Sequence, residues 1–138
     1  MLLLLVLSCA SHRQDRQDAR TDRLQTRNLS EAADLYWRAL RWDDYSVCAG
    51  FLEDPVYRTE WLTLESGSDW RYRDAAVLRV DLGPMPEGPE RREATVIVRV
   101  EGYSATTQIM ETSVRSQLWT LDGRSWWVEP GQERGIAP

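Results

Sequence analysis

Hydrophobic residues recur with the period of an α-helix through the first half of the chain. Between Leu29 and Leu40 they fall at every third or fourth position, a spacing that gathers side chains on one face of a helix. The members of this stripe are Leu29, Ala32, Ala33, Tyr36, Trp37 and Leu40. Asn28 can cap the helix, and Glu31 follows three residues later as in a capping box. The pattern therefore predicts an amphipathic helix that begins at Asn28.

Two shorter helices are expected next. Asp43 or Asp44 can cap the first of them. The apolar residues of this helix are Val47, Cys48, Phe51 and Leu52. The second is predicted over 55–65, because Asp54 is a typical N-cap and Pro55 suits the first helical position.

The second half of the chain changes to the period of a β-strand. Apolar and charged residues alternate over 70–82, and β-branched and aromatic residues dominate 95–103. A third long strand is expected over 106–120. On the apolar face of the first strand we expect Trp70, Tyr72, Ala76, Leu78, Val80 and Leu82. Residues 83–90 (GPMPEGPE) predict a loop, because proline and glycine interrupt strands.

A hairpin is predicted near the end of the chain. The Asp-Gly pair at 122–123 is a strong signal for a two-residue hairpin loop. With these two residues as the loop, Leu121 pairs with Arg124. Trp119 then stands opposite Trp126 on the last strand. Three helices followed by four antiparallel strands predict an α+β fold, in which the helices cover one face of the sheet.

Composition is consistent with one globular domain. The chain has 138 residues, of which 42% are hydrophobic and 28% charged, so a mainly disordered or fibrous protein is excluded. We place the α+β domain at 28–130 and expect a loose C-terminal tail over 131–138. The net charge of −5 argues against nucleic acid as a partner.

The segment before the domain differs in composition and charge. Residues 10–27 contain one large apolar residue, Leu24, and are otherwise rich in Arg, Gln, Asp and Thr. Such a segment buries too little apolar surface to offset its ordering entropy. We therefore expect residues 9–27 to form a flexible polar tether. With five Arg and three Asp, residues 1–27 carry a charge of +2, whereas the rest of the chain carries −7. This positive charge indicates either contact with anionic lipid head groups or a solvated linker, and the second is the favoured interpretation.

The N-terminal residues resemble an export signal. A short apolar run ends in small residues, as in signal peptides, and predicts a signal peptide over 1–8. The stretch Val6-Leu7-Ser8-Cys9 resembles the lipobox of bacterial lipoproteins. The resemblance implies cleavage before Cys9, lipidation of Cys9 with palmitate or a similar acyl chain, and a lipid anchor in the cell envelope. In that family Ala10 implies the outer membrane, with the domain facing the periplasm.

Candidate chemistry in the domain is sparse. No apolar run approaches the ~18 residues of a membrane-spanning helix, so an integral membrane protein is excluded. Cys48 lies in an apolar helical pattern and is expected to be a buried small residue; as a nucleophile it would need a base. The one histidine, His12, precedes the domain. We therefore expect no metal, no cofactor and no assigned catalytic residue.

An isomerase-type site would need a general base and a hydroxyl donor in an apolar cavity. The chain offers Asp34, Asp74, Tyr36, Tyr72 and Tyr103 for these roles. Asp74 interrupts the apolar face of the first predicted strand. Either it is desolvated there, with a raised pKa, or a strand irregularity turns it to solvent or a local hydrogen bond holds it; a structural role of the second kind is the favoured interpretation.

Aromatic and arginine residues allow two interpretations each. The seven Trp and five Tyr fall mostly at core positions, which favours packing over ligand stacking. Arg71, Arg73 and Arg79 are expected on one strand face, where they either meet an anionic partner or form a solvated sheet face.

A family resemblance covers about residues 28–130. YWRALRWDDY at 36–45 looks like the helical opening of small bacterial lipoproteins in the nuclear-transport-factor-two-like superfamily, and FLEDP at 51–55 looks like the junction that follows it. QLW at 117–119 with GRSWW at 123–127 is similar to the final hairpin of that superfamily. The resemblance implies a cone of curved sheet wrapped on helices, often with an apolar pocket, shared by enzymes and non-catalytic modules.

Three functional hypotheses follow. The first is a lipid-anchored envelope protein whose domain binds or assembles without catalysis, with a small apolar ligand or an envelope protein as partner. The second is an isomerase- or hydratase-type enzyme with a small pocket on the same fold. The third is a protein-interaction module, including a homodimer, that uses the outer face of the sheet. A pocket with a buried acid beside a tyrosine favours the enzyme, and a cavity filled by Trp side chains favours the binding module.

Overall fold

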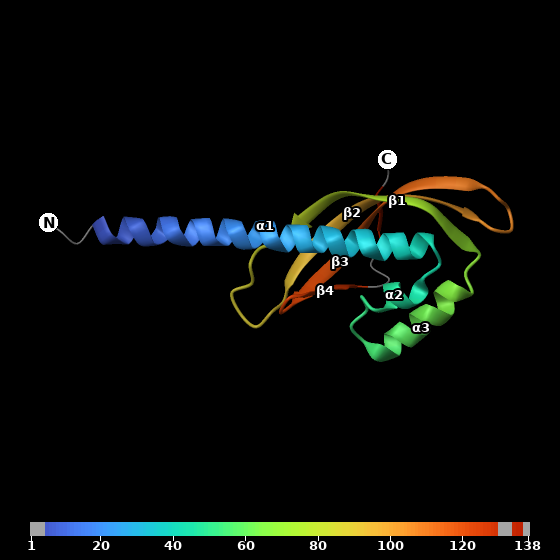
Figure 1. The fold of residues 1–138 in the computed structure, drawn as a ribbon, viewed down its shortest axis with the longest axis horizontal. Helices are drawn as coiled ribbons and strands as arrows, with labels where there is room; N and C mark the ends of the chain where they lie inside the picture. Colours follow the sequence, from blue (N-terminus) through green and yellow to red (C-terminus); the bar gives the residue numbers. More distant parts are fainter. Residues whose placement is uncertain (1–4, 130–133, 137–138) are drawn as a thin grey trace.

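A computed structural model describes residues 5–129 and 134–136, with side chains described over 13–129. Three helices precede the strands, as the hydrophobic period predicts. They are α1 (Leu5–Arg41), α2 (Tyr45–Ala49) and α3 (Pro55–Ser66). The strands are β1 (Trp70–Leu82), β2 (Arg92–Ser104), β3 (Met110–Asp122), β4 (Ser125–Val128) and β5 (Arg134–Ile136) (Figure 1).

The strands form one antiparallel sheet in the order β1-β2-β3-β4. Helices pack against this sheet, so the expected α+β class is confirmed. The short strand β5 also pairs with β3, beside residues 114–116. This corrects the expectation of a loose tail over 131–138, because residues 134–136 belong to the sheet. The other residues of that tail lie outside the described part of the chain.

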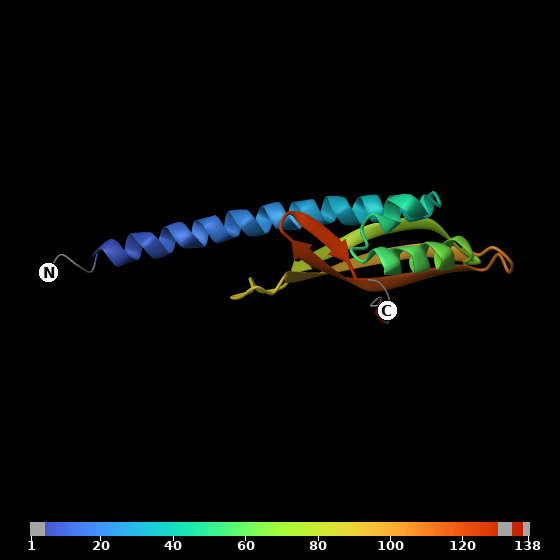
Figure 2. The same cartoon turned by 90° about the horizontal axis from the view of Figure 1, so that it is seen from below.

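The helix α1 is much longer than the hydrophobic stripe predicts. It spans 37 residues, so its start at Asn28 and the flexible tether over 9–27 are both corrected. Arg, Gln and Ala are good helix formers, which permits a helix without an apolar face. Asp22 and Gln25 also accept hydrogen bonds of 2.7 Å from the Arg92 side chain on β2, which attaches the polar part of α1 to the sheet. Figure 2 shows the remaining N-terminal turns extending beyond the sheet.

Two β-bulges change which side chains of β1 face the core. The pairing with β2 shifts between Tyr72 and Asp74 and again between Val77 and Arg79. Because each bulge inserts one extra residue, the alternation reverses at each of them. The apolar residues of β1 packed on the core are Tyr72, Ala75, Val77, Val80 and Leu82. The prediction of Ala76 and Leu78 on this face was therefore wrong, and Leu78 is 55% exposed.

The loop of the β3–β4 hairpin lies one residue later than expected, which shifts each pairing partner on β4 by two residues. Asp122 pairs with Ser125 and Leu121 with Trp126, so the loop is Gly123-Arg124 rather than the Asp-Gly pair. Gly123 has φ +61°, the conformation that a type II′ turn requires at its first loop position. Trp119 consequently pairs with Val128, and the expected Trp119–Trp126 pair does not form.

The space between the helices and the sheet is filled by aromatic rings. Tyr36 on α1 makes edge-to-face contacts with the rings of Trp37, Phe51 and Trp119 at centroid distances of 5.7–6.1 Å. Trp61 on α3 packs against Tyr36 at 6.4 Å. Such pairs add about 0.5–1.5 kcal/mol each beyond the area they bury. The aromatic cluster therefore occupies the interior in which a cone-shaped fold could hold a ligand.

One hydrogen bond attaches this cluster to the sheet, and a second close contact packs β1 against β2. The indole Nε1 of Trp37 donates a hydrogen bond of 2.9 Å to the side-chain oxygen of Gln117 on β3, and both residues are buried. Trp70 covers Gly102 on β2 so closely that a Cβ atom there would lie 2.7 Å from its ring. A side chain at position 102 would thus displace the first residue of β1.

Candidate functional site

A surface pocket lies where the junction between α2 and α3 meets the end of β4. Its volume is about 340 Å³, and its lining is mixed apolar and acidic. The lining residues are Leu52, Glu53, Asp54, Tyr57, Val128 and Glu129. Of these, Leu52 and Val128 are buried and form the floor, whereas the carboxylates of Glu53 and Asp54 are exposed at the rim.

Local sequence places these residues. Asp54 caps α3 by accepting a hydrogen bond of 2.8 Å from the backbone N–H of Val56, and Pro55 opens the helix. The side chain of Arg58, one turn further on, donates two hydrogen bonds to the carbonyl oxygen of Leu52, at 3.2 and 2.7 Å. The backbone N–H of Val128 donates to the carbonyl oxygen of Phe51 at 3.0 Å, which ties β4 to the junction. The pocket wall is therefore held on both sides by backbone contacts.

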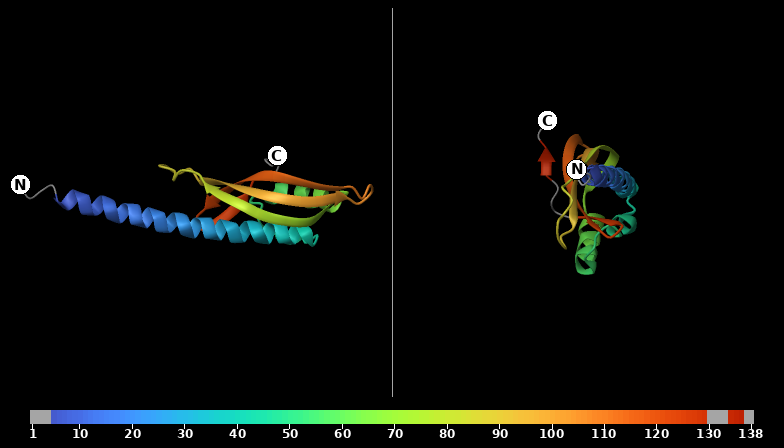
Figure 3. Two further views of the ribbon diagram at one scale, coloured as in Figure 1. Left: turned by 90° about the horizontal axis from the view of Figure 1, so that it is seen from above. Right: turned by 90° about the vertical axis from the view of Figure 1, so that its left-hand side faces the viewer.

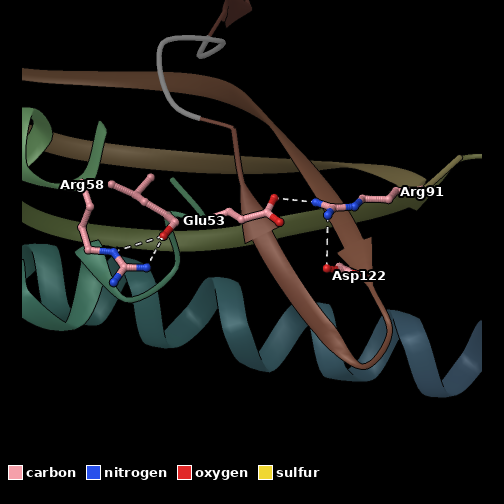
Figure 4. Close-up of polar contacts among 5 residues, drawn as sticks. Glu53, Arg58, Arg91 and Asp122 are labelled. Carbon is pink, nitrogen blue, oxygen red and sulfur yellow. Dashed lines mark hydrogen bonds and ion pairs between the residues drawn. The ribbon is translucent and has the colours of Figure 1, made fainter. Parts of the chain in front are cut away.

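Arg91 links the rim of the pocket to the hairpin. Figure 4 shows its guanidinium between Glu53, with which it forms a hydrogen-bonded ion pair, and Asp122 at the end of β3, 3.2 Å away. Arg91 ends the proline-rich loop before β2, so this bridge joins three segments that are far apart in the sequence. A second surface pocket, of about 590 Å³, is lined by Arg91 together with Pro84, Pro86 and Glu93 among others.

The electrostatics of the bridge oppose proton transfer. The hydrogen bond from Arg91 holds the pKa of Glu53 below its ordinary value, and the same bond raises the pKa of Arg91. Both groups stay charged at neutral pH, whereas a general acid needs a carboxyl with a raised pKa. The oxygen Oδ1 of Asp54 is engaged as a helix cap. This arrangement can attract or orient a charged partner, and it supplies no poised acid.

Asp74 does not lie in either pocket. It follows the first bulge of β1, and its half-exposed side chain lies 3.9 Å from Arg41 and 3.9 Å from Arg99. The bulge therefore turns Asp74 toward solvent, which confirms the strand irregularity that we favoured over a desolvated carboxylate.

The other candidates for an acid–tyrosine pair are scattered. Tyr36 is buried in the aromatic cluster, and Asp34 is exposed on α1. Tyr72 packs against Trp37, and Arg115 lies over its ring at 5.7 Å. Tyr103 pairs with Arg71 at the far end of β2. The structure brings none of these tyrosines together with a buried carboxylate among the described residues.

Cys48 is buried on α2, and its thiol donates a hydrogen bond to the carbonyl oxygen of Tyr36 at 3.3 Å. Burial raises the pKa of this thiol to about 12. Cys48 is therefore neutral at physiological pH and packs as a small core residue, in line with the structural interpretation.

The three arginines of β1 each have a partner. Arg71 donates to the carbonyl oxygen of Ser68 at 2.6 Å, Arg73 lies 3.5 Å from Glu101, and Arg79 lies 2.7 Å from Asp81. Arg73 and Arg79 are paired with carboxylates, and the guanidinium of Arg71 is held by backbone carbonyl oxygens.

Two polar residues that sequence reasoning missed are important for the interior. Arg92 is 7% exposed and donates to Asp22, Gln25 and the carbonyl oxygen of Gly83. Gln117 is fully buried beneath Trp37. Both fall in phase with the alternating core positions of their strands, and this phase is the one sequence signal that could have found them.

The side chain of Cys9, the predicted lipidation site, lies outside the described side chains, although its backbone is helical. Among the described residues, no helix is both long and apolar enough to cross a bilayer, and no cluster of three His, Cys, Asp or Glu could hold a metal ion. Comparisons with protein-family models, curated proteins and solved structures gave no match.

Proposed function

We propose that the chain is a lipid-anchored protein of the bacterial cell envelope, with an α+β domain that binds or assembles without catalysis. The anchor is proposed from the lipobox-like stretch Val6-Leu7-Ser8-Cys9. Acyl chains on Cys9 would supply membrane affinity in proportion to the number of methylenes that they bury. The outer membrane, facing the periplasm, is the proposed location.

The observation that carries the non-catalytic part is the filled interior. The rings of Tyr36, Trp37, Phe51 and Trp119 occupy the space between helices and sheet, in contact with one another. An isomerase or hydratase needs that space for its substrate. Binding is left to surfaces, and the pocket bordered by Glu53 and Tyr57 is one of them.

A second candidate surface is the outer face of the sheet, which supports the interaction-module hypothesis. Along β2, buried residues alternate with exposed or half-exposed ones, so the face away from the helices is open. Ile97, Val114 and Leu118 lie on it, half-buried. Size-exclusion chromatography with light scattering tests this candidate: a dimer that dissociates when Ile97→Lys is introduced supports it, and a monomer at high concentration counts against it.

The anchor is tested by metabolic labelling with radioactive palmitate. The unaltered chain should incorporate label and sediment with membranes, whereas Cys9→Ser should do neither. Cys48→Ser is the matched control, because it removes the other cysteine and should leave the label unchanged. Equal labelling of the unaltered chain and the Cys9→Ser chain would reject the anchor.

A further inference from the structure

Five arginines lie along one face of the N-terminal half of α1. Their spacing of three, four, three and four residues keeps them in line on a helix. They are Arg13, Arg16, Arg20, Arg23 and Arg27, and all five are exposed. We refer to them as the arginine face. At a rise of about 1.5 Å per residue, this face is about 21 Å long.

These arginines differ from most others in the molecule. None of the five forms a hydrogen bond or an ion pair with a described residue, whereas most arginines of residues 28–129 do. The engaged arginines are Arg41, Arg58, Arg71, Arg73, Arg79, Arg91, Arg92, Arg99 and Arg115. The arginine face is thus a row of positive charge that the described fold does not use.

The arginine face is directed away from the domain. On the same helical turns Asp15, Asp18 and Asp22 are in phase with the core residue Leu29, and Asp22 contacts Arg92 on the sheet. The aspartates therefore mark the side of α1 that faces the sheet, and the arginines lie on the side turned away from it. Figures 2 and 3 show the sheet on one side of the C-terminal part of α1, and the N-terminal turns extending beyond it.

Exposed apolar side chains accompany the arginines. Leu24, within the span of the arginine face, and Leu35, eleven residues further along α1, are 50% and 45% exposed and lie in one line on the helix beside the side that carries the arginines. Trp42, which follows the last residue of α1, is 72% exposed. Exposed Leu and Trp next to basic residues are typical of helices that lie in a membrane interface. The exposed acidic residues Glu31 and Asp34 also lie on the outer side of α1, between Leu24 and Leu35 in the sequence and after the last residue of the arginine face.

We infer that this side of α1 lies flat on a membrane surface that contains anionic lipid headgroups. The inference rests on the lipid anchor of the proposed function, because acyl chains on Cys9 would hold the first turn of the helix at the bilayer. Guanidinium groups bind phosphate oxygens through two parallel hydrogen bonds. The arginine face begins four residues after Cys9, so an anchored helix that lies flat would bring all five arginines to the headgroups. The acidic domain would then lie on the side of the helix away from the membrane.

A membrane fits this surface better than two other occupants. Nucleic acid would gain nothing from Leu35 and Trp42, and the charge of −7 on residues 28–138 would repel it. A second copy of the chain would have to offer carboxylates in a matching row. Of the aspartates that could form such a row, Asp22 is already bound to Arg92.

The experiment uses the full 138-residue chain with Cys9→Ser, so that no lipid anchor contributes. Binding is measured by flotation with vesicles of phosphatidylcholine alone and of phosphatidylcholine mixed with phosphatidylglycerol. We expect clear binding to the anionic vesicles, which falls as salt rises because screening weakens contacts between exposed charges. Apolar contacts of the N-terminal residues should be equal on both kinds of vesicle. The ratio of the two partition coefficients therefore measures the electrostatic contribution to binding.

The arginine face is tested by Arg16→Gln, Arg20→Gln and Arg23→Gln together. Each arginine near an anionic surface contributes about fivefold in partitioning, so the triple variant should lower the ratio on the order of 100-fold. The matched control changes Arg73, Arg79 and Arg124 to Gln, which removes the same charge from exposed positions of the domain. The control should retain most of the binding. Equal losses in the two triple variants would reject the inference.

The orientation is tested by a fluorescent label that reports polarity. Leu35→Cys labelled in the Cys9→Ser chain should shift to the blue on anionic vesicles, and Leu78→Cys, on the exposed side of β1, should not. The reverse pattern, or binding to DNA but not to vesicles, would overturn the inference while leaving palmitate labelling of Cys9 unaffected. Failure of labelling with vesicle binding intact would instead reject the proposed anchor.

Discussion

In the first turns of α1 that have described side chains, residues 13–20 are exposed on every side, whereas from Leu29 onward every turn buries an apolar side chain against the sheet. Both regions are regular helix, but different interactions hold them. The later region is stabilised by the burial of Leu29, Trp37 and Leu40, and the earlier one by intrinsic helix propensity and local side-chain contacts such as Gln14 to Asp18 at 3.1 Å. One helix thus packs against the domain core at its C-terminal end and presents a charged surface at its N-terminal end.

The largest loss of stability is expected from a substitution in the packed region of α1. Trp37→Ala removes a ring that is 1% exposed and leaves a cavity beside Tyr36, so the free energy of unfolding should fall by about 3–5 kcal/mol. Urea denaturation followed by circular dichroism measures it. Trp42→Ala, at 72% exposure just after the end of α1, is the control and should change stability by less than about 0.5 kcal/mol. Similar losses in the two variants would contradict the assignment of the core face.

A smaller effect is expected where the two regions meet. Arg92→Met keeps the aliphatic stem but removes the hydrogen bonds to Asp22, Gln25 and Gly83, so we expect a loss of about 1–2 kcal/mol. Hydrogen exchange should also become faster in the turns of α1 around Asp22, because this contact attaches them to the sheet. Arg16→Met is the matched control. An equal loss of stability in Arg16→Met would mean that the first turns of α1 pack against the domain, which would contradict their exposure.

The smallest effect comes from acid, and it acts on the domain. Ser104 and Thr106 donate hydrogen bonds to Asp69 and hold its pKa below its usual 3.8. A carboxylate whose pKa is lowered by folding stabilises the folded state at pH values above its pKa in the unfolded chain. This contribution disappears as pH falls through its pKa in the folded chain. Thermal melting should therefore show a decline in acid that is shallower for Asp69→Asn. If Asp69→Asn left the pH dependence of the melting temperature unchanged, the hydrogen bonds of Asp69 would not contribute to stability.

Much of the fold could be predicted from the sequence because its apolar residues follow two clear periods. The α+β class and the order of helices and strands follow from this pattern alone. The helical turns before Asn28 could not be predicted, since they have no apolar face and depend in part on Arg92, which lies 70 residues from its partner Asp22. The irregularity at Asp74 was expected because a carboxylate interrupts the apolar face there, whereas the bulge at Leu78 could not be predicted, because an apolar residue at that position fits the regular alternation.

The candidate site was less predictable than the fold. The cap at Asp54 follows from its position before Pro55, and the structure confirms it. The bridge from Arg91 to Glu53 and Asp122 joins residues 38 and 31 positions apart, and no local pattern indicates such a pair. Lipidation of Cys9 stays a prediction from the sequence.

The bulges of β1 have a consequence for how the protein behaves at high concentration. β1 is the first strand of the sheet order, so an unpaired row of backbone donors and acceptors would be open to a strand from another molecule. Arg73 and Leu78 each interrupt its register, which bends the strand and leaves only short straight stretches between them. A foreign strand could not align along the full length of β1. The bulges thus make β1 a poor template for edge-to-edge pairing between molecules.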